Sequence, residues 1–166
     1  FHRCLMKREF RSMSFEFFSN KGKFFKGNLH GHSTYSDGKL TPEEVCRAYI
    51  EKGYDFISIT DHFLEMFNYP ITSPDLKIKN FTVIPGAELH SSNMENGELW
   101  HVLALGINKE FTPPRQSNFL INTNSESIDS LSSRLFEAGA FVSLTHPEWN
   151  GMTLQDTLKI ENVHAL

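Results

Sequence analysis

The chain has 166 residues, with sixteen Lys and Arg against twenty Asp and Glu, which gives a net charge of −4 at pH 7. This length suits one domain with a hydrophobic core, and the charge excludes a general basic surface for nucleic acid, so any phosphate binding has to be local. Two cysteines without C-x-x-C spacing exclude a disulfide framework, and no apolar run reaches the length of a membrane span, so we expect a cytoplasmic protein without membrane partners.

The N-terminal residues 1–23 predict an extension separate from the main domain, which we place at residues 24–166. Phe15, Phe17 and Phe24 are spaced as short strands around a turn at residues 19–22, which indicates a small hairpin. An irregular aromatic cover over one end of the domain is the alternative. Neither interpretation places a catalytic or metal-binding residue in this extension.

The stretch GNLHGHSTYSDG, residues 27–38, contains two histidines that are two residues apart. If residues 27–32 form a strand, its period of two places His30 and His32 on one face, where they could bind one metal ion. Asp37 then returns from the following loop. An exposed strand with alternating polar residues has the same pattern, so this pair needs support from later strands.

A helix is predicted to begin at Pro42, because Thr41 suits the N-cap and Glu44 completes a capping box. Gly53 is typical of a residue that follows a helix end.

The rest of the chain alternates further strands and helices. We expect strands at residues 55–60, 81–90, 100–106 and 140–145, helices beginning at 128 and 153, long loops at 63–80 and 107–124, and the start of a sixth strand at 162–166. This alternation predicts an α/β fold with a mainly parallel sheet.

In such folds the functional groups gather at the carboxyl ends of the strands. Four different strands are followed by or end on metal-ligand types, namely His30 with His32, Asp61 with His62, Glu88, and His146. His101 is an exception, since it lies near the start of its predicted strand, and strand periodicity leaves its place open.

Two neighbours of these residues also have open roles. Asp61 suits a metal ligand or a partner that orients an imidazole equally well. His90 follows Glu88 by two residues and could share its face of the strand. We treat Asp61 and His90 as candidate catalytic residues.

Several imidazoles with a few carboxylates and no thiolate suit Zn²⁺, Mn²⁺ or Fe, and argue against a Cys-rich zinc site or an all-oxygen Ca²⁺ site. More than four candidate ligands indicate more than one ion. Two ions can share a bridging hydroxide and stabilise a phosphoryl displacement.

Five motifs in this order, HGHSTYSDG, ITDH, GAELH, HVLALG and THPEW, resemble the PHP (polymerase and histidinol phosphatase) family of metal-dependent phosphoesterases from about residue 24 to residue 166. The resemblance implies a distorted, TIM-like (β/α)7 barrel with two or three divalent ions. By the same resemblance, the metal ligands are His30, His32, Asp37, His62, Glu88 as the bridging carboxylate, His101 and His146.

The chain departs from the family pattern at its end. The family closes with an Asp-x-His motif on the last strand, whereas only Asp156, Glu161 and His164 follow here, in another arrangement. We count six strands rather than seven, and we expect the last strand or strands of the barrel to be missing from this chain.

The function expected from the resemblance is hydrolysis of a small-molecule phosphate ester, with a metal-bound hydroxide as the nucleophile and nucleic acid as an unexpected partner. One alternative is an amidohydrolase that cleaves C–N bonds, although the usual bridging lysine is absent. The other is a non-catalytic, metal-stabilised interaction module. The sequence indicates neither the substrate, the general acid nor the oligomeric state.

Overall fold

The computed structural model describes residues 22–75, 78–108, 110–122, 124–158 and 160–166. The hairpin expected in the N-terminal extension falls on residues 15–24 and so lies almost entirely outside the described residues.

The helices begin where their capping residues predict. Helix α1 (Pro42–Glu51) has Thr41 as its N-cap, with the complete capping box to Glu44. Helix α2 (Ile128–Glu137) follows an N-cap at Ser127. Helix α3 (Leu154–Thr157) is shorter than the helix over residues 153–160 that the sequence predicts. None of the described helices is long and apolar enough to cross a membrane.

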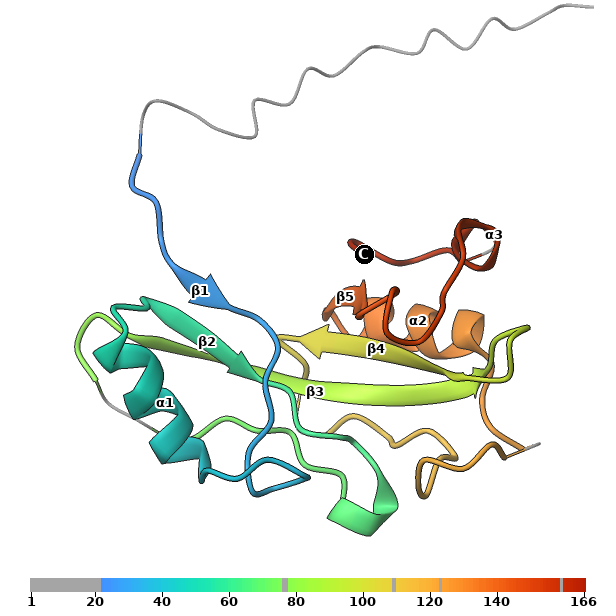
Figure 1. The fold of residues 1–166 in the computed structure, drawn as a ribbon, viewed down its shortest axis with the longest axis horizontal. Helices are drawn as coiled ribbons and strands as arrows, with labels where there is room; N and C mark the ends of the chain where they lie inside the picture. The colour runs from blue at the N-terminus through green and yellow to red at the C-terminus, as the bar shows by residue number, and fades with distance from the viewer. Residues whose placement is uncertain (1–21, 76–77, 109, 123, 159) are drawn as a thin grey trace, which may run out of the picture.

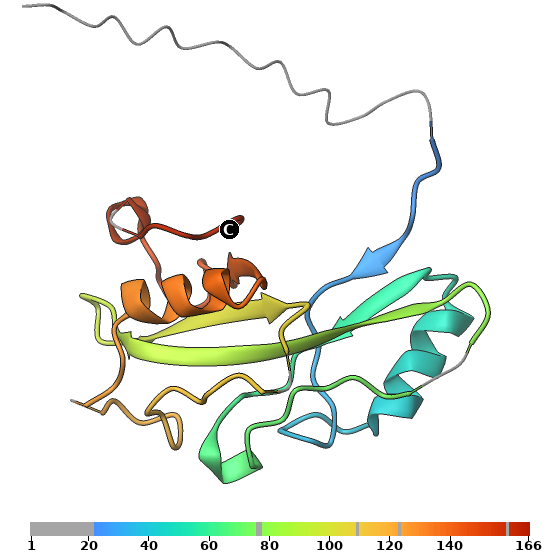
Figure 2. The same ribbon diagram turned by 180° about the vertical axis from the view of Figure 1, so that it is seen from behind.

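One sheet of five strands, in the order β1-β2-β3-β4-β5, runs through the described part of the chain. The strands are β1 (Gly27–Asn28), β2 (Phe56–Ile59), β3 (Thr82–Asn93), β4 (Leu99–Leu105) and β5 (Phe141–Leu144). Strand β3 is long and joins the two halves of the molecule (Figure 1). Helix α1 lies beside β2 in one half, and α2 lies beside β4 and β5 in the other, as the view from behind also shows (Figure 2). The curled mixed sheet confirms the α/β fold and is consistent with part of the barrel that the family resemblance implies (Figure 1 and Figure 2).

The prediction of a mainly parallel sheet is wrong for β4. Strand β1 pairs with β2, and β2 with β3, in parallel, but β4 runs antiparallel to both β3 and β5. The connection between β3 and β4, residues 94–98, is too short for the crossover that a parallel pair requires. The chain therefore turns back as a hairpin at this point.

The strand predicted for residues 27–32 is also shorter than expected, because β1 ends at Asn28. The chain leaves the sheet there, and the backbone oxygen of Gly31 accepts a hydrogen bond from the Thr60 N–H at 2.7 Å. His30 and His32 thus lie on a loop, and a shared strand face is not what brings them together. The expected sixth strand is present only as an isolated parallel bridge between Ser143 and Ala165.

Among the described residues, each half of the sheet packs against its helix through a hydrophobic cluster. The smaller one packs Val45 and Cys46 of α1 against Ile57 and Ile59 of β2. The larger one fills the space between α2 and strands β3, β4 and β5, with side chains such as Leu131 at its centre. The polar residues considered below lie beyond the ends of β2 and β5, beside the middle of β3 and the start of β4.

Gly86 permits the close approach of β3 to β2. A Cβ atom at this position would lie 2.2 Å from the Ser58 hydroxyl oxygen and 3.0 Å from the Thr60 methyl carbon. We expect Gly86→Ala to lower the free energy of unfolding by about 2 kcal/mol through overpacking, as measured by urea denaturation. Gly31→Ala is the matched control, since its nearest atom would be 3.7 Å away. Equal urea midpoints for the two variants would contradict this explanation.

Candidate metal centre

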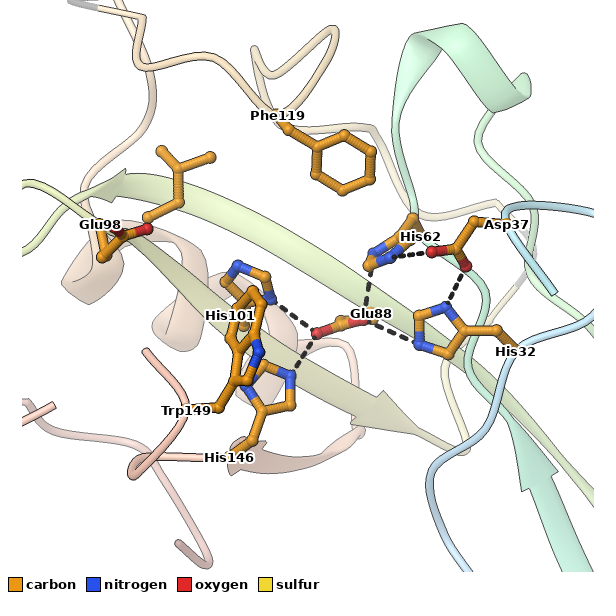
Figure 3. Close-up of a pocket in the computed structure, with 10 residues that line it drawn as sticks. His32, Asp37, His62, Glu88, Glu98, His101, Phe119, His146 and Trp149 are labelled. Atoms are coloured by element: carbon orange, nitrogen blue, oxygen red, sulfur yellow. Dashed lines mark hydrogen bonds and ion pairs between the residues drawn. The ribbon is translucent and has the colours of Figure 1, made fainter. Parts of the chain in front are cut away.

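The carboxylate of Glu88 lies at the centre of a ring of histidines. Its Oε1 is 2.8 Å from Nδ1 of His101 and 3.1 Å from Nε2 of His146. Its Oε2 is 3.1 Å from Nε2 of His32 and 3.0 Å from Nδ1 of His62. Figure 3 shows these four imidazoles converging on Glu88, which is fully buried. The two oxygens therefore face one pair of imidazoles each.

The strand ends explain how these side chains meet. His62 follows β2 and forms an isolated parallel bridge with Glu88 of the neighbouring strand. His146 follows β5 in the same way. Because β4 is antiparallel, its beginning lies beside the end of β3, and His101 pairs there with His90. The reversal of β4 thus answers the question that periodicity left open for His101.

Two further predicted ligands lie against this ring. Asp37 places Oδ1 2.7 Å from Nδ1 of His32 and Oδ2 3.5 Å from Nε2 of His62. His30 forms a hydrogen bond between its Nδ1 and the Thr60 hydroxyl oxygen at 2.7 Å, and the centre of its ring is 5.5 Å from that of His146. All seven residues that the sequence nominated as ligands therefore lie in one place.

The structure gives a physical reason to expect a cation here. Oε2 of Glu88, Nδ1 of His62 and Nδ1 of His146 are buried and have no hydrogen-bond partner among the described residues. Oε2 of Glu88 and Nδ1 of His62 approach to 3.0 Å but are not aligned for a hydrogen bond. Buried polar atoms without partners are costly, and metal coordination is one way to satisfy them.

Within the described part of the chain, three groups of side chains bring ligand atoms within 4.8 Å of one another. They are His30 with Glu88 and His146, His32 with Asp37 and His62, and His62 with Glu88 and His90. Imidazole nitrogens with carboxylate oxygens are the ligands that Zn²⁺ and related divalent ions prefer. The residues present therefore fit such ions.

The charge on Glu88 and the neutral ring of His30 also favour a cation at this centre. Burial would raise the pKa of Glu88, but the surrounding imidazoles hold it below its ordinary value, so the carboxylate is charged. Burial lowers the pKa of His30 to about 4, which leaves a neutral ring. For His32, burial is outweighed by the carboxylates of Glu88 and Asp37, which raise its pKa to about 9. An ion that bound to His32 at neutral pH would therefore have to displace its proton.

Asp61 lies beside the centre, but its carboxylate contacts backbone and hydroxyl donors instead of the histidines. It is fully buried, and four groups donate hydrogen bonds to its carboxylate: the Ser33 N–H and the Ser36 hydroxyl, both at 2.7 Å, and the hydroxyls of Ser33 and Thr72, both at 2.6 Å. It forms no hydrogen bond to an imidazole among the described residues. These contacts fix the loop that carries His32 and Asp37, so we infer that Asp61 is a positioning residue.

His90 is fully buried next to the ring of histidines. Its ring centre is 4.3 Å from that of His101 and 5.0 Å from that of His62. Burial and the neighbouring His101 lower its pKa well below the ordinary value, so the ring is neutral.

A cavity of about 530 Å³ opens over the centre. Phe119 stands on one side, with its ring centre 4.7 Å from that of His62, and Trp149 stands on the other, 5.2 Å from His146 (Figure 3). Glu98 also lines the cavity. Sequence reasoning did not single out Phe119, because it comes from the long loop 107–124, where no periodicity marks a residue.

The chain is similar in sequence to a known protein family and to several of its members. The family model for the PHP domain matches residues 28–146 of the chain. The DNA polymerase/3'-5' exonuclease PolX of Bacillus subtilis is 37% identical over 78 residues, which cover 39% of this chain and 14% of PolX. The 5'-3' exoribonuclease Rnm of Escherichia coli is 35% identical over 97 residues, which cover 56% of this chain and 31% of Rnm. The chain thus spans less than a third of the length of either relative.

Two solved structures share the fold. One is a two-domain protein from Bacteroides vulgatus containing a predicted PHP-like metal-dependent phosphoesterase; it has a TM-score of 0.50 and 22% identity, over 82% of this chain and 39% of that one. The other is an amidohydrolase from Chromobacterium violaceum, with a TM-score of 0.55 and 14% identity, over 78% of this chain and 70% of that one. At these identities the likeness concerns the fold alone.

The positioning role of Asp61 leads to a stability prediction. Asp61→Ala leaves buried donors on Ser33 and Thr72 without an acceptor, so we expect a loss of about 3 kcal/mol in the free energy of unfolding. Ser36→Ala removes one donor and keeps the acceptor, and should cost about 1 kcal/mol. Urea denaturation in the presence of a chelator measures both without a metal contribution. A loss for Asp61→Ala no larger than that for Ser36→Ala would refute the role.

Proposed function

Because this chain belongs to the PHP family, we propose that it is a divalent-metal-dependent phosphoesterase whose centre is organised by Glu88. The observation that carries the proposal is the buried Glu88 carboxylate, whose two oxygens face two separate pairs of imidazoles. A carboxylate with this surrounding suits a bridge between two ions.

We assign the seven predicted ligands to this centre. Glu88 would bridge, with His30, His101 and His146 on the side of Oε1, and His32, His62 and Asp37 on the side of Oε2. When bound, divalent ions lower the pKa of a water molecule and offset charge on phosphoryl oxygens. Zn²⁺, Mn²⁺ and Fe all suit these ligands.

The chain's own residues would prepare the centre for an anionic substrate. Asp61 holds the loop of His32 and Asp37 in place through its four hydrogen bonds. Asp37, unlike the buried Glu88, is exposed in the cavity wall, with 56% of its side chain accessible.

The aromatic walls favour a substrate with a flat ring next to its phosphate. Trp149 is 73% exposed and Phe119 is 42% exposed, and both border the cavity over the centre. Exposed aromatic faces stack on nucleobases with little dependence on sequence. We therefore extend the expected small phosphate esters to nucleotides.

The end of a nucleic acid strand is a second candidate substrate. The sequence-based expectation set nucleic acid aside because the net charge is −4. Two relatives, however, carry the names of an exonuclease and an exoribonuclease. A single terminal nucleotide between Trp149 and Phe119 would need only this local site, so the net charge does not oppose it.

Glu88→Gln tests the function itself. The variant keeps the volume of Glu88 but loses the negative charge, so we expect metal-activated hydrolysis of p-nitrophenyl phosphate to fall at least about a hundredfold. Chelation should abolish the activity of the unaltered protein, and Zn²⁺ or Mn²⁺ should restore it. Glu137→Gln, at the exposed end of α2, is the control with unchanged activity.

Three outcomes would count against the proposal. Activity that survives chelation would exclude a metal-dependent reaction. Hydrolysis of cyclic amides without hydrolysis of phosphate esters would support the amidohydrolase alternative. Bound metal that stabilises the fold without any turnover would support the interaction module.

Trp149→Ala tests the preference for a flat ring. Loss of stacking on one base corresponds to about 1–3 kcal/mol, so we expect KM for a nucleoside monophosphate to rise about tenfold, with glycerol phosphate little affected. Leu154→Ala removes another exposed apolar side chain, away from the cavity, and should change neither substrate. Steady-state kinetics on both substrates provide the comparison. Equal losses on both would mean that Trp149 does not recognise a base.

A further inference from the structure

His90 is a buried histidine that the assigned ligand set does not use. It has no accessible surface, and neither of its ring nitrogens has a hydrogen-bond partner among the described residues. A neutral imidazole normally donates from one nitrogen and accepts at the other. Two unpartnered nitrogens on one buried ring therefore need a physical explanation.

Two more unpartnered atoms lie next to His90. Nδ1 of His62 and Oε2 of Glu88 are buried and form no hydrogen bond, although they are only 3.0 Å apart. Ligand atoms of these three residues lie within 4.8 Å of one another. Each of the three residues can offer an electron pair to the same cation.

We propose that His62, Glu88 and His90 form an inner metal position for a divalent cation such as Zn²⁺, with His90 as an additional ligand. The proposal rests on the proposed function only in that the centre binds divalent ions. The position is buried on all three sides, whereas Asp37 of the neighbouring group is largely exposed. An ion held there would lie at the inner wall of the cavity, which His62 and Glu88 line.

The two nitrogens of His62 support this position. Its Nδ1 faces Oε2 of Glu88 at 3.0 Å, and its Nε2 lies 3.5 Å from Oδ2 of Asp37. A neutral imidazole has one free electron pair, so it can serve one ion. With Nδ1 on the inner ion, Nε2 of His62 would face Asp37 at the 3.5 Å ion-pair distance, and a carboxylate beside a ligating histidine is common at metal sites. In this refinement of the assignment above, His62 belongs to the inner ion, and Asp37 orients its ring instead of sharing an ion with it.

Glu88 can bind an ion at the inner position with one carboxylate oxygen and an ion beside His101 and His146 with the other. Its Oε2 lies 3.0 Å from Nδ1 of His62, and its Oε1 lies beside His101 and His146. The inner ion would thus fix the orientation of the carboxylate that the rest of the centre depends on.

The alternative is that His90 only fills space beside His101 and Phe119, whose ring centres are 4.3 and 5.4 Å away. His90→Leu separates the two roles, because leucine can fill the space but cannot bind a metal. We expect the chelator-treated variant to melt at the same temperature as the unaltered protein or higher, since two unpartnered nitrogens are gone. We expect its tightest zinc affinity to weaken at least tenfold and the zinc-induced rise in melting temperature to shrink.

Isothermal titration with Zn²⁺ and thermal melts with and without Zn²⁺ provide these readouts. His164→Leu is the control, as His164 lies away from the cavity and should leave zinc binding unchanged. Unchanged zinc affinity and stoichiometry in His90→Leu would overturn the proposal while leaving metal-dependent hydrolysis intact. An unaltered protein that binds no zinc would overturn both.

A second measurement applies if His90→Leu does not fold. His90→Gln is the milder variant, with the same expected loss of zinc affinity. In addition, ¹⁵N-histidine NMR of the unaltered protein counts the rings whose nitrogen shifts change on zinc binding. Six shifted rings, those of His30, His32, His62, His90, His101 and His146, support the proposal. Five or fewer, with a ring in the ordinary hydrogen-bonded tautomer at His90, overturn it.

Discussion

Burial of the Glu88 carboxylate is the constraint on which this structure depends. Removing a charge from water is expensive unless partners replace the lost hydration. Here the partners come from four separate segments: the loop after β1, the residue after β2, the start of β4 and the residue after β5. The halves of the sheet therefore meet at one side chain, and an ion bound there would join them further.

Local signals in the sequence predicted most of the fold. Thr41 with Glu44 located the start of α1, and the β-branched run before Asp61 located β2. The direction of β4 was not predicted, because hydrophobic periodicity is the same for parallel and antiparallel strands. Only the short connection between β3 and β4 contained that information. His101 was consequently placed by family resemblance rather than by strand geometry.

The sequence predicted which side chains would meet, but not how they would be held together. The six other nominated ligands lie around Glu88, yet His30 and His32 do so from a loop, because the chain leaves the sheet at Asn28. The environment of Asp61 depends on hydroxyl donors from distant residues such as Thr72, which no local pattern reveals. The unpartnered nitrogens of His90 are likewise a property of the packed structure.

Anomalous X-ray scattering at the zinc edge, from crystals grown with Zn²⁺, tests the central claim most directly. If Glu88 organises a metal centre, strong peaks will lie about 2.0–2.2 Å from its carboxylate oxygens, each also within reach of an imidazole nitrogen. Absence of a peak at Glu88, or zinc found only at exposed side chains elsewhere, would contradict the account.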